Sequence, residues 1–252
     1  MNLFDEREEC LIRIINNARI ITNRLANTID KHGSLVHFRP SSNGISIIGL
    51  LPTAPQRGKS NFRDFDGINN DFENMFAKHC TEPPKRVTPE KELQSYLISE
   101  SYKNKRMIKP LNDTQKHLDN LTFITDEIAL PAQSNKIVCD LLALRMTNLD
   151  CIPVVIELKS KRDRRIINQV NNYSMIVNDH KDKFEMLFSE ILGKEIKFTS
   201  ACDKWIVWPG ITNKGTGELD IEPREHELKE KGITAVTYQK SSTSGSPSFL
   251  FK

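Results

Sequence analysis

Three strand-like segments in close succession constrain the fold of this chain more than any other feature. Residues 121–130 (LTFITDEIAL), 136–146 (KIVCDLLALRM) and 151–158 (CIPVVIEL) are rich in β-branched and other apolar residues, and only the short segments PAQSN and TNLD separate them. Such runs, bounded by turn residues, are typical of β-strands. Connections this short join neighbouring antiparallel strands, so the sequence predicts a meander.

Helices and further strands follow the meander. Helical apolar spacing recurs over residues 164–177 and 184–193, whereas KWIVWP (204–209) predicts a short strand. A charged helix ended by glycine (222–232) and a final strand (233–239) come next. A meander that continues into strand-helix-strand crossovers implies a central mixed β-sheet flanked by helices, which is an α/β fold.

The N-terminal part predicts a helix and a hairpin. Apolar residues recur at helical spacing over residues 6–29. The runs SLVHF (34–38) and GISIIGLL (44–51) flank RPSSN, so we expect a hairpin with a turn of four or five residues. Residues 51–71 contain proline, glycine, asparagine and charges without periodicity, and we expect a loop there.

A second long helix is predicted at residues 88–105. Thr88 is a good N-cap, Pro89 suits the first helical position, and acidic residues follow in the first turn, where the helix dipole favours them. We place the domain boundary just before this helix. Residues 1–85 then form a helix-plus-hairpin extension to which the sequence assigns no role, and residues 86–252 form the main domain.

Composition excludes several classes of protein. The chain has 252 residues, of which 38% are hydrophobic and 27% charged, as in ordinary globular proteins, and its net charge of +3 permits a nucleic-acid partner without arguing for one. A charged N-terminus and the lack of a run of roughly 18 apolar residues predict a cytoplasmic protein with no membrane association. Five scattered cysteines argue against a disulfide framework or a zinc ribbon.

Acidic residues at two strand positions indicate chemistry. Asp140 lies inside an apolar run, and Glu157 and Lys159, two residues apart, share one face of the next strand. If the two strands pair, both carboxylates converge, and a divalent cation such as Mg²⁺ removes the cost of burying them together. The lysine ammonium could then position an attacking water or offset charge on a phosphate. The alternative is a surface Glu-Lys pair at a strand end.

Three further features surround these residues, and each has a plainer alternative. Glu90 shares a helical stripe with Leu93 and Leu97, although it could simply be a first-turn acid that favours the helix dipole. Gln169 and Tyr173 are four residues apart on one helix face, or that face is merely polar with the tyrosine half-buried. A basic cluster beside the strand end would clamp phosphates or form a solvated loop; it contains Lys159, Lys161, Arg162, Arg164 and Arg165.

In combination these residues resemble the PD-(D/E)XK nuclease superfamily, which has the restriction-endonuclease-like fold. Its core has the element order α-β-β-β-α-β, and the resemblance spans residues 88–239. One departure is Cys139, which stands where the family has a proline before the aspartate. The matching positions, in the family's order, are Glu90, Asp140, Glu157-Leu158-Lys159 and Gln169 with Tyr173.

The resemblance implies a metal-dependent reaction. Asp140 and Glu157 would ligate Mg²⁺ or Mn²⁺ together with the backbone carbonyl of Leu158. Lys159 would orient or activate the water, and Glu90 would hold a metal-bound water or a second ion. The reaction would be phosphodiester hydrolysis by in-line attack of water, so the protein would be a nuclease.

The resemblance also implies how substrate is bound. Gln169 and Tyr173 would support the site or touch the strand, and DNA is the expected substrate. By analogy, a homodimer would allow both strands of a duplex to be cut. RNA as substrate, endonuclease or exonuclease action, and a catalytically inactive nucleic-acid- or protein-binding module on the same fold all remain open alternatives. The residues expected to contact phosphates are Lys161, Arg162, Arg164 and Arg165.

Overall fold

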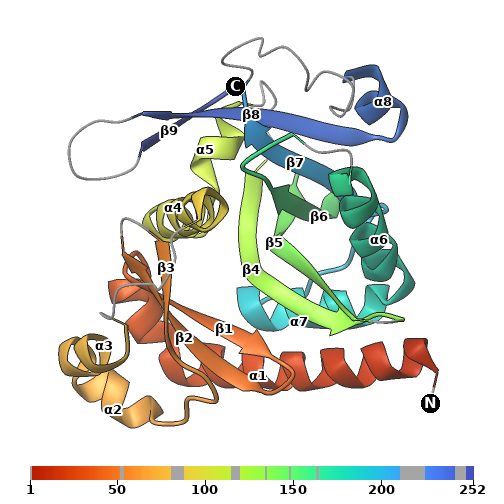
Figure 1. The fold of residues 1–252 in the computed structure, drawn as a ribbon. Helices are drawn as coiled ribbons and strands as arrows, with labels where there is room; N and C mark the ends of the chain where they lie inside the picture. Colours follow the sequence, from red (N-terminus) through yellow and green to blue (C-terminus); the bar gives the residue numbers. More distant parts are fainter. Residues whose placement is uncertain are drawn as a thin grey trace.

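A mixed β-sheet of six strands forms the centre of the molecule (Figure 1). The computed structural model describes residues 2–51, 54–80, 88–114, 120–133, 135–147, 149–162, 165–210, 225–241 and 248–252. The strands lie in chain order, with β4, β5 and β6 antiparallel, β6, β7 and β8 parallel, and β9 antiparallel to β8. Their bounds are β4 Asn120–Pro131, β5 Lys136–Met146, β6 Cys151–Leu158, β7 Asp203–Pro209, β8 Ile233–Ser241 and β9 Ser248–Phe251.

Helices cover both faces of this sheet. One face packs against α6 and α7 and against the first half of the N-terminal helix α1, and the other packs against α4 and α5. The predicted α/β class and the predicted helix at residues 88–105 are confirmed, including the N-cap at Thr88, whose hydroxyl accepts from Lys91 N. The helices are α1 Leu3–His32, α4 Pro89–Lys103, α5 Lys109–Asn112, α6 Arg165–Asp179, α7 Lys181–Leu192 and α8 Glu225–Glu230.

A second, three-stranded antiparallel sheet precedes α4. It consists of β1 (Val36–Ser41), β2 (Gly44–Leu51) and β3 (Ala54–Lys59). The predicted hairpin is confirmed, but the turn is shorter than predicted, because Arg39, Pro40 and Ser41 pair with β2 and leave only two residues between the strands.

The loop predicted over residues 51–71 is wrong. This segment contains β3 and the helix α2 (Phe65–Asn70), and α3 (Phe72–Cys80) follows. Strand β3 is polar and contains proline and glycine, so its pairing with β2, and not its own propensity, creates it. Gly58 is required there, since a Cβ atom at this position would lie 1.7 Å from the His79 carbonyl oxygen.

Helix α1 belongs to two hydrophobic cores. Residues of its first half, such as Leu11 and Ile14, are buried with the six-stranded sheet, whereas Leu25 and Ile29 of its second half are buried with β1, β2, α2 and α3. Figure 1 shows this helix running beneath both sheets. The expected boundary near residue 85 separates the sheets along the sequence, but the two parts share this helix. Within the described residues, no helix has both the length and the apolar character needed to cross a lipid bilayer.

Candidate functional site

Asp140 and Glu157 lie where strands β5 and β6 part. Backbone pairing between the strands extends to Leu141 and Ile156 and stops one residue before the two acids. Asp140 turns into the opening, and its Oδ2 accepts a hydrogen bond of 2.8 Å from the backbone N–H of Leu158. The carboxylate thus occupies the end of the ladder, which keeps the strands apart at this point.

Lys159 completes the predicted cluster. Its Nζ atom lies 3.5 Å from Glu157 Oε2 and 3.9 Å from Asp140 Oδ2. The lysine backbone is fixed as well, since its N–H donates to Val207 O of the neighbouring parallel strand. The structure therefore brings together the three side chains that the sequence pattern placed on adjoining strands.

The electrostatics of the cluster depend on Glu157. Its side chain is only 2% exposed, against 25% for Asp140 and 21% for Lys159. Burial and the nearby Asp140 carboxylate raise the pKa of Glu157 to about 8, although the Lys159 ammonium opposes the shift. The Oε1 atom of Glu157 is buried and has no hydrogen-bond partner among the described residues.

An orphaned carboxylate oxygen of this kind suits a metal ligand. Leaving it without a partner costs free energy that a bound cation would recover. Among the described residues, no group of three or more His, Cys, Asp or Glu side chains is arranged to hold a metal ion. Two carboxylates are nevertheless compatible with Mg²⁺, which keeps several waters and usually takes one or two protein carboxylates. The Asp140 and Glu157 pair therefore fits Mg²⁺ or Mn²⁺, and the Leu158 carbonyl as a further ligand stays a prediction.

Glu90 reaches the site from the first turn of α4. Its Oε1 accepts hydrogen bonds from Ser160 N at 3.0 Å and from Ser160 Oγ at 3.1 Å, so it anchors the residue after Lys159. Its predicted role toward a water or a second ion stays a prediction. Glu92, in the same turn, is the more buried of the two acids and pairs with Lys240 of β8 at 2.7 Å.

Tyr173 and Gln169 of α6 differ in exposure. Tyr173 is fully buried, and its hydroxyl donates to Ile128 O of β4 at 3.0 Å. Burial raises the pKa of its phenol, and the nearby Cys139 and Glu157 add to the shift. The prediction that Tyr173 touches nucleic acid is therefore wrong, because its side chain is fully buried. The alternative, that it supports the site, stays a prediction. Gln169 is exposed and makes no described hydrogen bond to the acidic pair or to Lys159, so its catalytic role stays a prediction.

The basic segment after β6 is fixed mainly through Arg162. Its Nε donates to Pro209 O at 3.1 Å, and its guanidinium lies 5.0 Å from the centroid of the Trp208 ring. Lys161 and Arg165 are exposed, and Arg164 lies outside the described residues. A phosphate-binding role for the four residues stays a prediction.

A polar network supports Asp140 from the side of α4. The Gln94 side-chain amide donates to the Asp140 backbone carbonyl and to Asp126 Oδ2, each at 3.1 Å, and accepts from Lys91 Nζ at 2.8 Å. Lys91 also forms an ion pair with Glu127. Sequence reasoning missed these residues, although the adjacent acids Asp126 and Glu127 inside an apolar run were a signal of the same kind as Asp140.

Asp126 connects this network to the N-terminal sheet. It is fully buried and accepts hydrogen bonds from His37 Nε2 and Arg39 Nε of β1, both at 2.8 Å. Burial favours its neutral form, but Arg39 and His37 hold the pKa of Asp126 well below its usual range. Burial lowers the pKa of His37, so the neutral imidazole donates to Asp126 and accepts from the Tyr102 hydroxyl at 2.8 Å.

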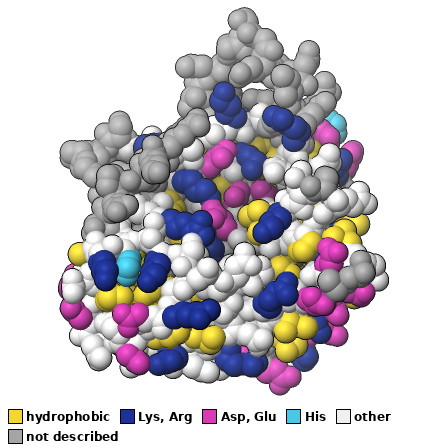
Figure 2. Space-filling model, turned by 60° about the horizontal axis from the view of Figure 1, so that its bottom comes forward, with side chains coloured by type: hydrophobic (Ala, Val, Ile, Leu, Met, Phe, Trp, Pro, Cys, Tyr) yellow, Lys and Arg dark blue, Asp and Glu magenta, His cyan; other side chains and the backbone are white. Residues whose placement is uncertain are grey.

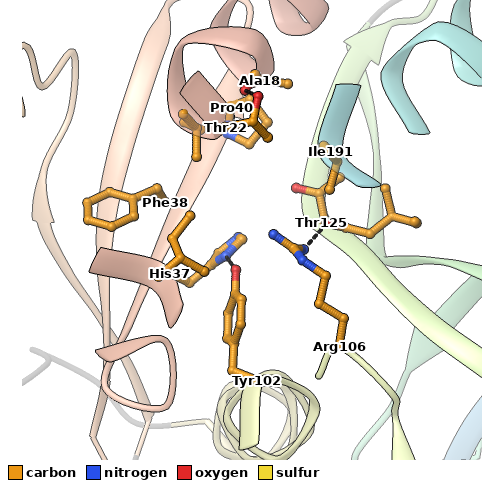
Figure 3. A pocket seen from close by; sticks show the side chains of 12 residues that line it. Ala18, Thr22, His37, Phe38, Pro40, Tyr102, Arg106, Thr125 and Ile191 are labelled. Atoms are coloured by element: carbon orange, nitrogen blue, oxygen red, sulfur yellow. Dashed lines mark hydrogen bonds between the residues drawn. The ribbon is translucent and has the colours of Figure 1, made fainter. Parts of the chain in front are cut away.

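A small cavity lies beside His37, between the N-terminal sheet and β4 (Figure 3). His37, Tyr102, Arg106 and Thr125 line it, and its volume of about 10 Å³ is close to what one water molecule requires. The Thr125 Oγ1 atom is buried without a hydrogen-bond partner among the described residues. A single water in the cavity could hydrogen-bond to this hydroxyl, so we assign the cavity to the packing of the two sheets.

Side chains of opposite charge lie close together on one face of the molecule (Figure 2). On the face shown in Figure 2, acidic side chains gather near the middle with lysine and arginine side chains around them. No protein-family model matches the chain, and no curated protein shows significant similarity to it.

Proposed function

We propose that the protein is a metal-dependent nuclease that hydrolyses phosphodiester bonds of nucleic acid, with DNA as the expected substrate. The observation that carries the proposal is the buried Glu157 carboxylate, which has one oxygen without a partner among the described residues and lies beside Asp140 with the Lys159 ammonium 3.5 Å away. The element order from α4 through β4, β5, β6 and α6 to β7 supports a restriction-endonuclease-like core.

The residues of the site would share the work as follows. Asp140 and Glu157, with the Leu158 carbonyl, would hold Mg²⁺ or Mn²⁺, which when bound supplies a Lewis acid for phosphoryl oxygens. Lys159 is held between two carboxylates, so its ammonium is oriented to donate to an attacking water and to offset phosphate charge. Glu90 fixes Ser160 and thereby the backbone that carries Lys159.

A second candidate is a catalytically inactive module that binds nucleic acid or protein on the same fold. The contact of Glu90 with Ser160 favours it, because this oxygen serves a structural role within the chain. The small number of acidic side chains at the site also favours this candidate. Among the described residues, two of them approach Lys159. Fold alone does not decide between the two candidates.

Cleavage assays distinguish the nuclease from the inactive binding module. Single- and double-stranded DNA and RNA would be incubated with Mg²⁺, with Mn²⁺ and with a chelator. We expect metal-dependent cleavage by the wild-type protein and a loss of about 100-fold or more in Lys159→Ala and Asp140→Ala, as for other removed electrostatic catalysts. Lys197→Ala is the matched control, since this lysine is 71% exposed and pairs with Glu185 on α7. Nucleic-acid binding with no cleavage under any divalent ion would exclude the nuclease and leave the binding module.

A further inference from the structure

A second pocket opens beside the candidate site, where β7 ends next to the middle of β8. Its volume is about 240 Å³. Residues from the segment after β6, the end of β7, the middle of β8 and the strand β9 line it, among them Arg162, Gly210, Tyr238, Gln239 and Leu250. A space of this size is large enough for a planar heterocyclic group.

The pocket is joined to Lys159 through one side chain. The Tyr238 hydroxyl donates to the Lys159 carbonyl oxygen at 3.3 Å, and the Tyr238 carbonyl accepts from Gly210 N at 2.9 Å. Strands β6 and β7 are parallel, so the residues that follow both strands lie at the same edge of the sheet. A polynucleotide with a phosphate at Lys159 would therefore extend past or into this pocket.

The lining of the pocket suits a nucleotide. The guanidinium of Arg162 is planar and is oriented by Pro209 O and the Trp208 ring. Leu250 is a large apolar side chain that is 63% exposed, and Gln239 offers an amide that can both donate and accept. Among the described lining residues two are cationic and none is an aspartate or a glutamate. Unpaired bases stack on arginine planes and apolar side chains, and amides read their edges.

We propose that this pocket binds one unpaired nucleotide of a nucleic-acid strand, adjacent to the phosphodiester bond at Lys159. The inference rests on the proposed nuclease function and deepens it, because it specifies a substrate with at least one unpaired nucleotide beside the cleaved bond. A blunt, fully paired duplex cannot place a base in the pocket, so single strands, overhangs and frayed ends are the preferred substrates.

Gly210 provides the sharpest test. A Cβ atom at this position would meet its nearest neighbours, in Gln239 and Tyr238, at 3.8 Å, which is an ordinary contact distance. Gly210→Leu should therefore fill the pocket without a backbone clash. Binding of a fluorescein-labelled single-stranded DNA oligonucleotide would be measured by anisotropy in a chelator, where no cleavage occurs. We expect Gly210→Leu to weaken binding by about fivefold or more, the loss typical of one stacked base.

Two further variants make the result interpretable. Asn23→Leu is the matched control, because it adds an exposed leucine on α1, far from β8 and β9. Arg162→Lys keeps the positive charge but removes the planar stacking surface, so it should also weaken binding of the single strand. If Gly210→Leu fails to fold, as judged by thermal melting, Arg162→Lys decides the question by the same measurement.

The outcomes separate the pocket from the proposed function. Wild-type cleavage with unchanged affinity in Gly210→Leu and Arg162→Lys would overturn the pocket and leave the nuclease. Binding that these variants weaken, with no cleavage under any metal, would overturn the nuclease and support a nucleotide-binding pocket. A wild-type protein that binds no single strand would overturn the pocket, and equal affinity for blunt duplex and single strand would overturn the stated preference.

Discussion

A glutamate in water ionises well below neutral pH, but burial holds the pKa of Glu157 at about 8 in the folded protein. Between these two pH values the folded protein binds a proton that the unfolded chain has released. The stability of the protein therefore falls as the pH rises through this window, as far as Glu157 determines it. An ionised Glu157 would thus favour binding of the proposed metal ion. Without that ion, burial of the ionised carboxylate lowers the stability of the folded protein.

We therefore expect Glu157→Gln to raise the free energy of unfolding and to abolish the proposed cleavage of nucleic acid. The glutamine amide carries no charge, so the desolvation penalty disappears at pH 8. Urea unfolding in a chelator should show a free energy of unfolding higher than that of the wild type by about 1 kcal/mol or more, since one pKa unit corresponds to about 1.36 kcal/mol. Glu9→Gln is the control, because Glu9 forms an exposed pair with Arg13. This substitution should change the free energy of unfolding by less than about 0.5 kcal/mol. A destabilised Glu157→Gln variant at pH 8 would contradict this account of the site.

Metal binding should also depend on pH. A divalent ion requires the ionised carboxylate, so binding at Glu157 releases a proton and becomes more favourable as the pH rises toward 8. We expect Mg²⁺ or Mn²⁺ to raise the melting temperature more at pH 8 than at pH 6. Asp140→Asn should remove most of this increase at both pH values. An equal increase at pH 6 and pH 8 would show that Glu157 does not ligate the ion.

At the scale of elements, the contact between β1 and β4 contains a buried ion pair. Asp126 is fully buried and depends on Arg39, which is 12% exposed, and on His37 for its hydrogen bonds. Arg39→Met would leave this carboxylate without its guanidinium partner, and removal of one partner of a buried pair typically costs about 3–5 kcal/mol. Chemical denaturation of the variant measures this loss.

The matched control for Arg39→Met is Arg24→Met. Arg24 and Asp66 also form an Arg-Asp pair, but their side chains are 50% and 79% exposed. Exposed pairs contribute about 0–1 kcal/mol, so this variant should be close to the wild type. If both substitutions had the same small effect, the buried network would not be what joins the N-terminal sheet to β4.

The elements that the sequence predicted well are those with a strong local pattern. Strands β4, β5 and β6 alternate or are continuously apolar, and α4 has a clear cap and first turn. Strand β3 has no such pattern, because its pairing with β2 and the close approach of α3 at Gly58 create it. Contacts between segments distant in the sequence are invisible to a local pattern.

The same distinction applies to the candidate site. Glu157 and Lys159 were placed on one face by the two-residue period of a strand, and the short connection from β5 brought Asp140 beside them. The support of Asp140 by Gln94 and Asp126 needs a helix, a strand and the N-terminal hairpin to meet, which no spacing within one element predicts. The four-residue spacing places Gln169 and Tyr173 on one helix face, but it does not indicate which of the two side chains is buried.

At the scale of the whole molecule, α1 contributes residues to the cores of both sheets. Leu11 packs in the core of the six-stranded sheet and Leu25 in that of the N-terminal sheet, and neither is exposed. Trp205 and Trp208 both lie on β7, so tryptophan fluorescence reports on the six-stranded sheet.

Leu25→Ala therefore tests whether the two cores unfold together. Large-to-small core substitutions typically cost about 2–5 kcal/mol. If the cores are coupled, Leu25→Ala should lower the urea midpoint seen by tryptophan fluorescence about as much as Leu11→Ala does, although Leu25 belongs to neither of the clusters that hold Trp205 and Trp208. A tryptophan transition that is unchanged by Leu25→Ala would mean that the two parts unfold independently.

The position of α1 also has a consequence for how the protein is made. The ribosome synthesises this helix before the other described elements, but the core that Leu11 and Ile14 share includes residues as far along the chain as Ile233. At about 5–20 residues per second, translation takes roughly 10–40 s to advance from the end of α1 to that residue. Until β4, α6 and α7 have been made, the core around the first half of the helix is incomplete, which leaves its apolar residues available to chaperones.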